Sequence, residues 1–202
     1  MRSETGRTFT EQARRRQFVE CAVEVIAELG FAQASLARIA ARAGTSKGVI
    51  SYHFRDKDEL LDQVLLDIYV EMAQFIGPRM AAATTASGKL AAYLESNLEY
   101  MRLHRSQLLA LRQICPNLRD AEGNLRHEAE PGGPRDVVIE QFLKEGQELG
   151  EFRAFDVAVM AVTIRSAVDG ALDHWAQAPD LDLAAYAAEL VTLFTHATRG
   201  ST

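Results

Sequence analysis

Apolar residues recur every three or four positions along most of the 202-residue chain, which is the spacing of one face of an α-helix. Glycine, proline and short polar runs separate these stretches. The periodic stretches predict helices over residues 8–30, 35–43, 46–54, 57–76, 89–114, 135–149, 156–176 and 182–198, with an interruption near His104. The pattern therefore predicts an all-α protein.

Residues 35–54 carry the most informative pattern, because helix-ending signals lie between two short apolar faces. Ser35 and Ser46 stand where the hydroxyl of an N-cap residue accepts an unpaired backbone N–H group. Gly44 follows the first face, and glycine ends a helix in the left-handed conformation without steric cost. The apolar positions of the two faces are Leu36, Ile39, Ala40, Ala43, Ile50 and Phe54. We expect a helix, a tight turn and a second helix.

The second of these helices turns polar and small side chains outward. They are Lys47, Gly48, Val49, Ser51, Tyr52 and His53. The lysine can reach guanine or phosphate, the valine can meet a thymine methyl, and the bare glycine allows a close backbone approach. Such a face suits the major groove of DNA. From the spacing alone, a surface helix in an ordinary bundle explains the pattern equally well.

The residue identities separate these two interpretations. The run GFAQASLARIAARAGTSKGVISYHFRDKDELL, residues 30–61, resembles the DNA-binding segment of the TetR family of transcriptional regulators almost position by position. The matching residues are Gly30, Phe31, Ser35, Ile39, Ala40, Ala43, Gly44, Ser46, Gly48, Ile50, Tyr52, His53, Phe54, Lys57, Asp58 and Leu60. One departure is Ser51, where the family usually has a tyrosine that often touches a phosphate. This contact is in doubt here, because serine reaches less far.

The resemblance implies two domains. Residues 8–56 would form a three-helix DNA-binding domain with the helix-turn-helix at about 35–54, and residues 57–202 a larger helical ligand-binding and dimerisation domain. The expected DNA-binding residues are Ser35, Arg38, Thr45, Ser46, Lys47, Gly48, Val49, Ser51, Tyr52, His53 and Lys57. Lys57 would hold a phosphate together with the N-terminus of its helix. Arg14, Arg15 and Arg16 are further candidates for phosphate contacts, although a solvated helix face explains them as well.

The charge distribution fits this division. The net charge is −6, which is unexpected for a DNA-binding protein. Residues 1–57, however, carry ten Lys/Arg against six Asp/Glu, whereas residues 58–202 carry twelve against twenty-two. A basic head with an acidic remainder would orient the molecule on a duplex.

The remainder of the chain is longer than dimerisation needs, and the resemblance implies a ligand pocket in it. Methionine and aromatic side chains favour a mostly apolar effector, although ordinary core packing accounts for each of them. The candidates are Met72, Phe75, Met80, Tyr93, Tyr100, Met101, Phe142 and Trp175, with Asp169 and His174 as polar anchors. Residues 116–134 hold three prolines and three glycines and predict a long loop, either a lid or an ordinary surface loop.

The last two predicted helices, at about 156–176 and 182–198, combine small and apolar side chains that allow close helix approach. Packing within one chain is one explanation. The resemblance favours a homodimer in which these helices meet the same pair of a second chain.

Other chemistries lack a sequence signal. We find no Walker loop, zinc-finger spacing or G-x-S-x-G motif, and the five histidines are scattered, so no cofactor or metal is expected. No apolar run suits a transmembrane helix, and the N-terminus has no signal-peptide core. Cys21 and Cys115 lie far apart, which favours free thiols and a reducing cytoplasm. Cys115 is a weak candidate for a redox sensor, with only Arg112 and Arg119 near it in sequence.

These features predict a DNA-binding transcriptional regulator and not an enzyme. We expect a repressor that binds double-stranded DNA at an inverted repeat and is released by a small, mostly apolar molecule. An activator, or a regulator that needs no ligand, would have the same fold. A helical-bundle enzyme or scaffold is the alternative of another class, and a lack of sequence-specific DNA binding would favour it.

Overall fold

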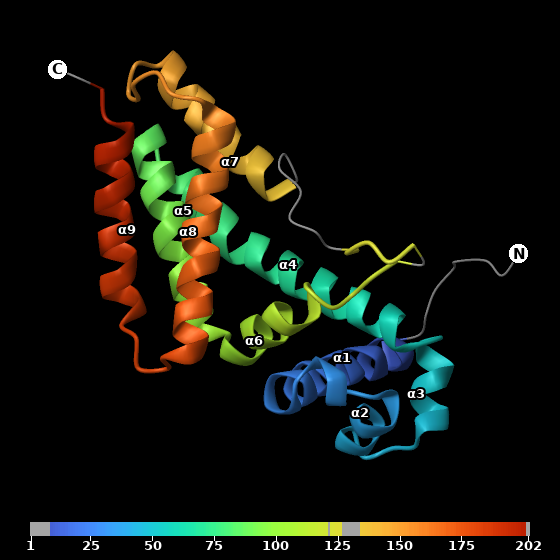
Figure 1. Cartoon of the computed structure of the whole chain (residues 1–202). Helices are drawn as coiled ribbons and strands as arrows, with labels where there is room; N and C mark the ends of the chain where they lie inside the picture. The colour runs from blue at the N-terminus through green and yellow to red at the C-terminus, as the bar shows by residue number, and fades with distance from the viewer. Residues whose placement is uncertain (1–8, 121, 127–133, 201–202) are drawn as a thin grey trace, which may run out of the picture. The chain divides into compact units, whose positions relative to one another are not determined.

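The computed structural model of the chain describes residues 9–120, 122–126 and 134–200, and every regular element in this part is helical (Figure 1). The elements are α1 (Phe9–Leu29), the 3-10 turn η1 (Phe31–Gln33), α2 (Leu36–Arg42), α3 (Lys47–His53), α4 (Lys57–Ala82), α5 (Ala86–Leu103), α6 (Arg105–Ile114), α7 (Pro134–Glu148), α8 (Val157–Gln177) and α9 (Leu183–Thr198). The predicted all-α class is confirmed. The predicted first residue of the first helix, Thr8, lies outside the described residues.

Contacts between residues divide the chain into two compact units. The first comprises Met1–Val70 and Ser106–Glu128, and the second Glu71–Arg105 and Ala129–Thr202. The first part of α4 and most of α6 thus group with the N-terminal helices. The functional boundary expected between residues 56 and 57 stays a prediction.

In the first unit α1 packs against both α2 and α3, and α2 against α3 (Figure 1). The core between them is made of Phe18, Ala22, Val25, Ile26, Ile39, Ala40, Ile50 and Phe54. Leu29 is 42% exposed. It is the last residue of α1, where the packed face has already ended at Ile26.

The second unit is a bundle in which α5 packs against α7, α8 and α9, and α7 packs against α8. Its buried side chains include Tyr93, Leu94 and Leu98 of α5, Ile164 and Val168 of α8, and Phe194 of α9. Each of the last two helices begins at an aspartate cap. Asp156 accepts the backbone N–H of Val159, and Asp182 accepts that of Ala185, both at 3.0 Å.

Helix α4 is longer than the predicted 57–76 and continues through Pro78 to Ala82. Proline deprives the helix of one N–H group and usually ends it. Here Pro78 lies in the penultimate turn, and the side chain of Arg79 donates to the carbonyl of Phe75 at 2.6 Å. The break before α5 is consequently short. The predicted interruption at His104 is confirmed, since α5 ends at Leu103 and α6 begins at Arg105.

The first part of the predicted loop, residues 116–120 and 122–126, is folded locally. The Asp120 carboxylate accepts the backbone N–H groups of Glu122 and Asn124 at 3.0 and 2.8 Å. Arg126 then pairs with Asp62 on α4 at 2.8 Å. Residues 121 and 127–133 lie outside the described part, so the prediction of a lid is untested.

Candidate nucleic-acid interface

The turn between α2 and α3 has the geometry that the sequence predicts. The Ser35 hydroxyl accepts the N–H of Arg38 at 3.3 Å, as an N-cap residue does. Gly44 has a φ of 66°, in the left-handed region where a side chain would be strained. Ser46 occupies the N-cap position of α3, but its hydroxyl makes no capping hydrogen bond.

Five of the six α3 residues that were expected to point outward are exposed, whereas His53 is half-buried. Tyr52 is 76% and Val49 38% exposed, and Lys47, Gly48 and Ser51 are also exposed. Ile50 and Phe54 are fully buried, so the helix is anchored from its other side. This arrangement leaves a row of polar and small groups free to meet a partner.

The flanking candidates are placed less uniformly. Ser35 and Ser46 are exposed, and Thr45 is half-buried. Arg38 is exposed and donates to the Gln33 side chain at 2.8 Å. At Gly48 an added Cβ would meet only Ser46 Oγ, at 3.7 Å. Packing within the protein therefore does not require a glycine there, whereas close approach of a partner would.

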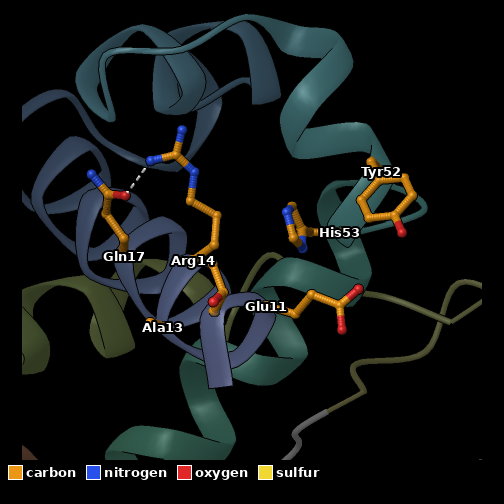
Figure 2. A pocket seen from close by; sticks show the side chains of 7 residues that line it. Glu11, Ala13, Arg14, Gln17, Tyr52 and His53 are labelled. Carbon is orange, nitrogen blue, oxygen red and sulfur yellow. Dashed lines mark hydrogen bonds between the residues drawn. The ribbon is translucent and has the colours of Figure 1, made fainter. Parts of the chain in front are cut away.

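An open hollow lies beside this face, between the start of α1 and the end of α3 (Figure 2). Its lining residues are Thr10, Glu11, Ala13, Arg14, Gln17, Tyr52 and His53. Figure 2 shows the half-buried His53 ring between Arg14 and the more exposed Tyr52. The hollow thus continues the α3 surface onto α1.

The Lys57 ammonium group makes two contacts within the protein. Its Nζ donates to the backbone carbonyl of Phe31 at 2.8 Å and lies 4.0 Å from the centre of the Phe31 ring. Burial lowers the pKa of this amine below its ordinary value, because the charged form loses water. Lys57 therefore ties the segment before α2 to the helix after α3.

The three arginines of α1 differ from one another. Arg16 is exposed, and Arg14 donates to the Gln17 side chain at 2.7 Å. Arg15 is only 9% exposed and binds the backbone carbonyl of His53. The expectation of a phosphate contact is therefore wrong for Arg15, because its guanidinium is engaged inside the protein.

The predicted ligand contacts of the second unit fall into separate groups. Phe75 and Tyr100 lie 5.5 Å apart, and the Tyr100 ring stacks on His104 at 4.1 Å. Burial, together with the charge of Glu71, raises the pKa of the Tyr100 hydroxyl above its ordinary value. Met72 and Met80 are half-buried, and Met101 is buried.

A second group joins α5 to α7, where the rings of Tyr93 and Phe142 lie 6.3 Å apart. Trp175 is buried, and the Arg105 guanidinium lies 4.5 Å from the centre of its ring. The exposed His174 lies with its ring 6.2 Å from that of Tyr186 on α9. The candidates thus pack in pairs between helices.

A buried ion pair in this unit escaped the sequence interpretation. Arg165 on α8 donates to Asp136 on α7 at 2.6 Å, and both side chains are almost fully buried. Asp169, predicted as a polar anchor, lies 3.5 Å from the same arginine. A sequence signal did exist, since Arg165 falls on the apolar stripe of its helix between Ile164 and Val168.

Within the described residues, no three His, Cys, Asp or Glu side chains are grouped so that they could hold a metal ion. No helix there combines the length and apolar character needed to cross a bilayer. Neither cysteine is part of a disulfide, and the Cys115 sulfur lies 3.6 Å from the Tyr69 hydroxyl.

Comparison with known proteins places the helix-turn-helix in a family. A family model described as bacterial regulatory proteins, tetR family, matches residues 18–64. The HTH-type transcriptional regulator BetI of Cronobacter sakazakii (strain ATCC BAA-894) is 33% identical over 99 residues, which are 48% of this chain and 49% of the relative. The chain thus spans about half the length of the curated relatives it matches.

Solved structures resemble the chain over most of its length. The fatty acid degradation regulator FadR from Bacillus halodurans has a TM-score of 0.76 and 22% identity, covering 90% of this chain and 94% of that one. FadR from Bacillus subtilis, in complex with stearoyl-CoA, has a TM-score of 0.73 and 25% identity, covering 89% and 97%. Residues 18–64 thus match the TetR family of bacterial regulatory proteins, and the solved structures share the fold over most of the chain.

Proposed function

We propose that the protein is a sequence-specific transcriptional regulator that places α3 in the major groove of double-stranded DNA. The exposed face of α3, anchored from behind by the buried Ile50 and Phe54, carries this proposal. Lys47 would contact a guanine edge or a phosphate, and Val49 a thymine methyl. Lys57 keeps two donors beyond its bond to Phe31, and these would reach a phosphate. Because its target is DNA, the protein would act in the cytoplasm.

The protein would act as a homodimer through α8 and α9. The solvent-facing side of α8 carries Val159, Thr163, Ser166 and Gly170, and that of α9 carries Ala185, Ala188 and Thr192. The Thr163 hydroxyl donates to the carbonyl of Val159 at 2.7 Å, within its own helix. The Thr192 hydroxyl does the same on α9, at 2.9 Å. Because each hydroxyl is bonded within its own helix, α8 and α9 present a surface of small and apolar groups that a second copy would cover.

Two-fold symmetry of such a dimer requires an inverted repeat in the DNA. Half-sites read from one face of the duplex have centres about one turn, ~34 Å, or a multiple of it apart. This geometric requirement gives the operator a form that can be tested before its sequence is known.

The second unit would hold a small, mostly apolar effector whose binding releases the DNA. Tyr100 and Phe142, whose rings pack against Phe75 and Tyr93, would contact such a molecule. The FadR structure from Bacillus subtilis contains stearoyl-CoA, which carries a long acyl chain. Release requires different affinities for the DNA-binding and the released conformer, with couplings of about 1–3 kcal/mol in typical cases.

The experiment is selection of DNA sites by the purified full-length protein, from random and genomic fragments at near-physiological salt. Recovery of one inverted repeat supports the proposal and supplies the probe for an effector screen. Recovery of fragments without a shared sequence, both before and after refolding to remove any bound effector, would overturn it. A reporter gene under the recovered site then separates repression from activation.

A further inference from the structure

Arg15 lies where three elements of the first unit meet. It belongs to α1, and its guanidinium donates to the backbone carbonyl of His53, the last residue of α3. The guanidinium carbon lies 3.9 Å from the centre of the Phe54 ring. Its Nη2 also pairs with Glu59 Oε1 on α4 at 3.5 Å. One buried side chain therefore contacts both the end of α3 and the start of α4.

The contact between Arg15 and the His53 carbonyl stabilises the C-terminal end of α3. The last carbonyl groups of a helix have no partner within the helix, and α3 has only seven residues. A helix this short has little stability of its own, so its orientation depends on tertiary contacts. A cation at the C-terminus also interacts favourably with the helix dipole. Arg15 supplies both the hydrogen bond and the charge at this end.

Glu59 extends the contact to the segment that follows α3. Its Oε2 accepts the backbone N–H of Arg55 at 2.9 Å, while its Oε1 faces Arg15. Arg15 therefore binds the backbone of residue 53, and Glu59 binds the backbone of residue 55. We call this group, made of the Arg15 and Glu59 side chains and the backbone of residues 53–55, the α3 clamp.

We propose that Arg15 is a positioning residue for sequence reading: through the α3 clamp it fixes the orientation of α3 without touching DNA. The inference rests on the proposed function. Hydrogen bonds to base edges weaken steeply when distance or angle changes, so they require a fixed helix. Attraction to phosphates is long-ranged and tolerates displacement. Loss of the clamp therefore lowers discrimination between sequences and leaves general DNA affinity in place.

The geometry requires arginine and not merely a cation. A planar guanidinium can donate to the carbonyl, stack on the Phe54 ring and face Glu59 at the same time. A lysine offers a compact charge at one point and cannot make all three contacts. Arg15→Lys therefore loses part of the α3 clamp while keeping the net charge.

The test compares Arg15→Lys with Arg16→Lys, because Arg16 is exposed and one position away. Affinity is measured for the selected inverted repeat and for an unrelated duplex, at several salt concentrations. Arg15→Lys should lower the ratio of specific to nonspecific affinity by about tenfold or more, the scale of one good base contact. Nonspecific affinity and its salt slope should stay within about twofold of the wild type. Arg16→Lys should keep the wild-type ratio.

Thermal unfolding of each variant shows whether the assay temperature lies below its transition. If Arg15→Lys does not fold, Glu59→Gln decides, because an amide oxygen still accepts the Arg55 N–H but the charge facing Arg15 is lost. It should lower the ratio in the same direction. A wild-type ratio in the folded variant, or a parallel loss of both affinities, would overturn the inference. Absence of any specific site for the wild type would instead count against the proposed function.

Discussion

Lys57 at the start of α4 donates a hydrogen bond to the backbone carbonyl of Phe31, so one side chain joins the segments on either side of the helix-turn-helix. The Nζ–O distance is 2.8 Å, and the ring of Phe31 lies against the same ammonium group. An ammonium group has three donors, so it can hold Phe31 and still meet a phosphate. Lys57 thus has a structural role beside its proposed role on DNA.

Lys57→Ala and Lys47→Ala should therefore differ in two respects. Lys57→Ala should lower the free energy of unfolding by about 1 kcal/mol, the scale of one hydrogen bond, and reduce the salt slope of DNA binding by about 1. Lys47→Ala should leave stability unchanged, since Lys47 is exposed, and alter sequence preference. Chemical unfolding and site selection measure both. A uniform loss of affinity in both variants would contradict the base contact of Lys47.

Gly170→Leu tests the dimer without disturbing the protomer. An added Cβ at Gly170 meets no atom within 4 Å, and leucine favours helix. The protomer should stay folded, whereas a partner helix could no longer approach closely. Sedimentation should show weaker dimerisation, with Ala73→Leu as the control because Ala73 is an exposed residue of α4. Unchanged dimerisation of Gly170→Leu would exclude this interface.

Removing one partner of the buried pair of Asp136 and Arg165 should destabilise the protein more than replacing both partners with apolar residues. Asp136→Ala should lower the free energy of unfolding by about 3–5 kcal/mol, because a buried guanidinium loses its close partner. The double variant Asp136→Leu, Arg165→Met should be more stable than Asp136→Ala, since two apolar side chains need no partners. Denaturant unfolding of both variants checks this order, and the reverse order would refute it.

Gly146 on α7 should not tolerate even a methyl group. An added Cβ would collide with Cδ2 of the buried Phe152 ring. Gly146→Ala should cost about 1–3 kcal/mol of stability through overpacking. Gly170→Ala, where an added Cβ meets no atom within 4 Å, should instead stabilise by about 0.5–1 kcal/mol through helix propensity. Thermal unfolding distinguishes the two, and equal effects would show that the close contact at Gly146 is relieved easily.

Asp56 should make a pH-dependent contribution at the start of α4. The backbone N–H of Glu59 donates to its carboxylate at 2.8 Å, and this bond, with the Arg55 side chain, lowers the pKa of Asp56 below its ordinary value. The stabilisation is therefore present above the unfolded pKa of about 3.9 and lost as pH falls through the lower folded pKa.

Asp56→Ala should accordingly cost about 1 kcal/mol at neutral pH, as the loss of an N-cap does. The gap between variant and wild type should narrow below about pH 4. Urea unfolding at both pH values measures it, with Asp58→Ala as the exposed neighbouring control. An equal gap at both pH values would mean that the carboxylate charge has no part in the cap.

Local sequence signals predicted most of the helices and the outward face of α3. The caps Ser35, Asp156 and Asp182 and the turn at Gly44 depend on neighbouring residues alone, so the sequence contains them. Pro78 was misleading, because a proline in the penultimate turn disturbs only the end of a helix.

Contacts between distant residues could not be predicted in the same way. Arg15 and Lys57 look like surface cations in the sequence, and their positive charge fits DNA equally well. Only the fold shows that one binds the carbonyl of His53 and the other that of Phe31, 38 and 26 positions away. Such partners depend on how helices pack, which spacing along one helix does not reveal.

The most direct test of the account is the ratio of affinities for the selected inverted repeat and for a scrambled duplex of the same length and composition, at one near-physiological salt concentration. If α3 reads base edges in two half-sites, the repeat should bind at least about 10³-fold more tightly, the lower end for specific DNA-binding proteins. Scrambling one half-site should remove most of that advantage. A ratio near one would mean that the exposed face of α3 does not read sequence, and it would contradict the proposed function.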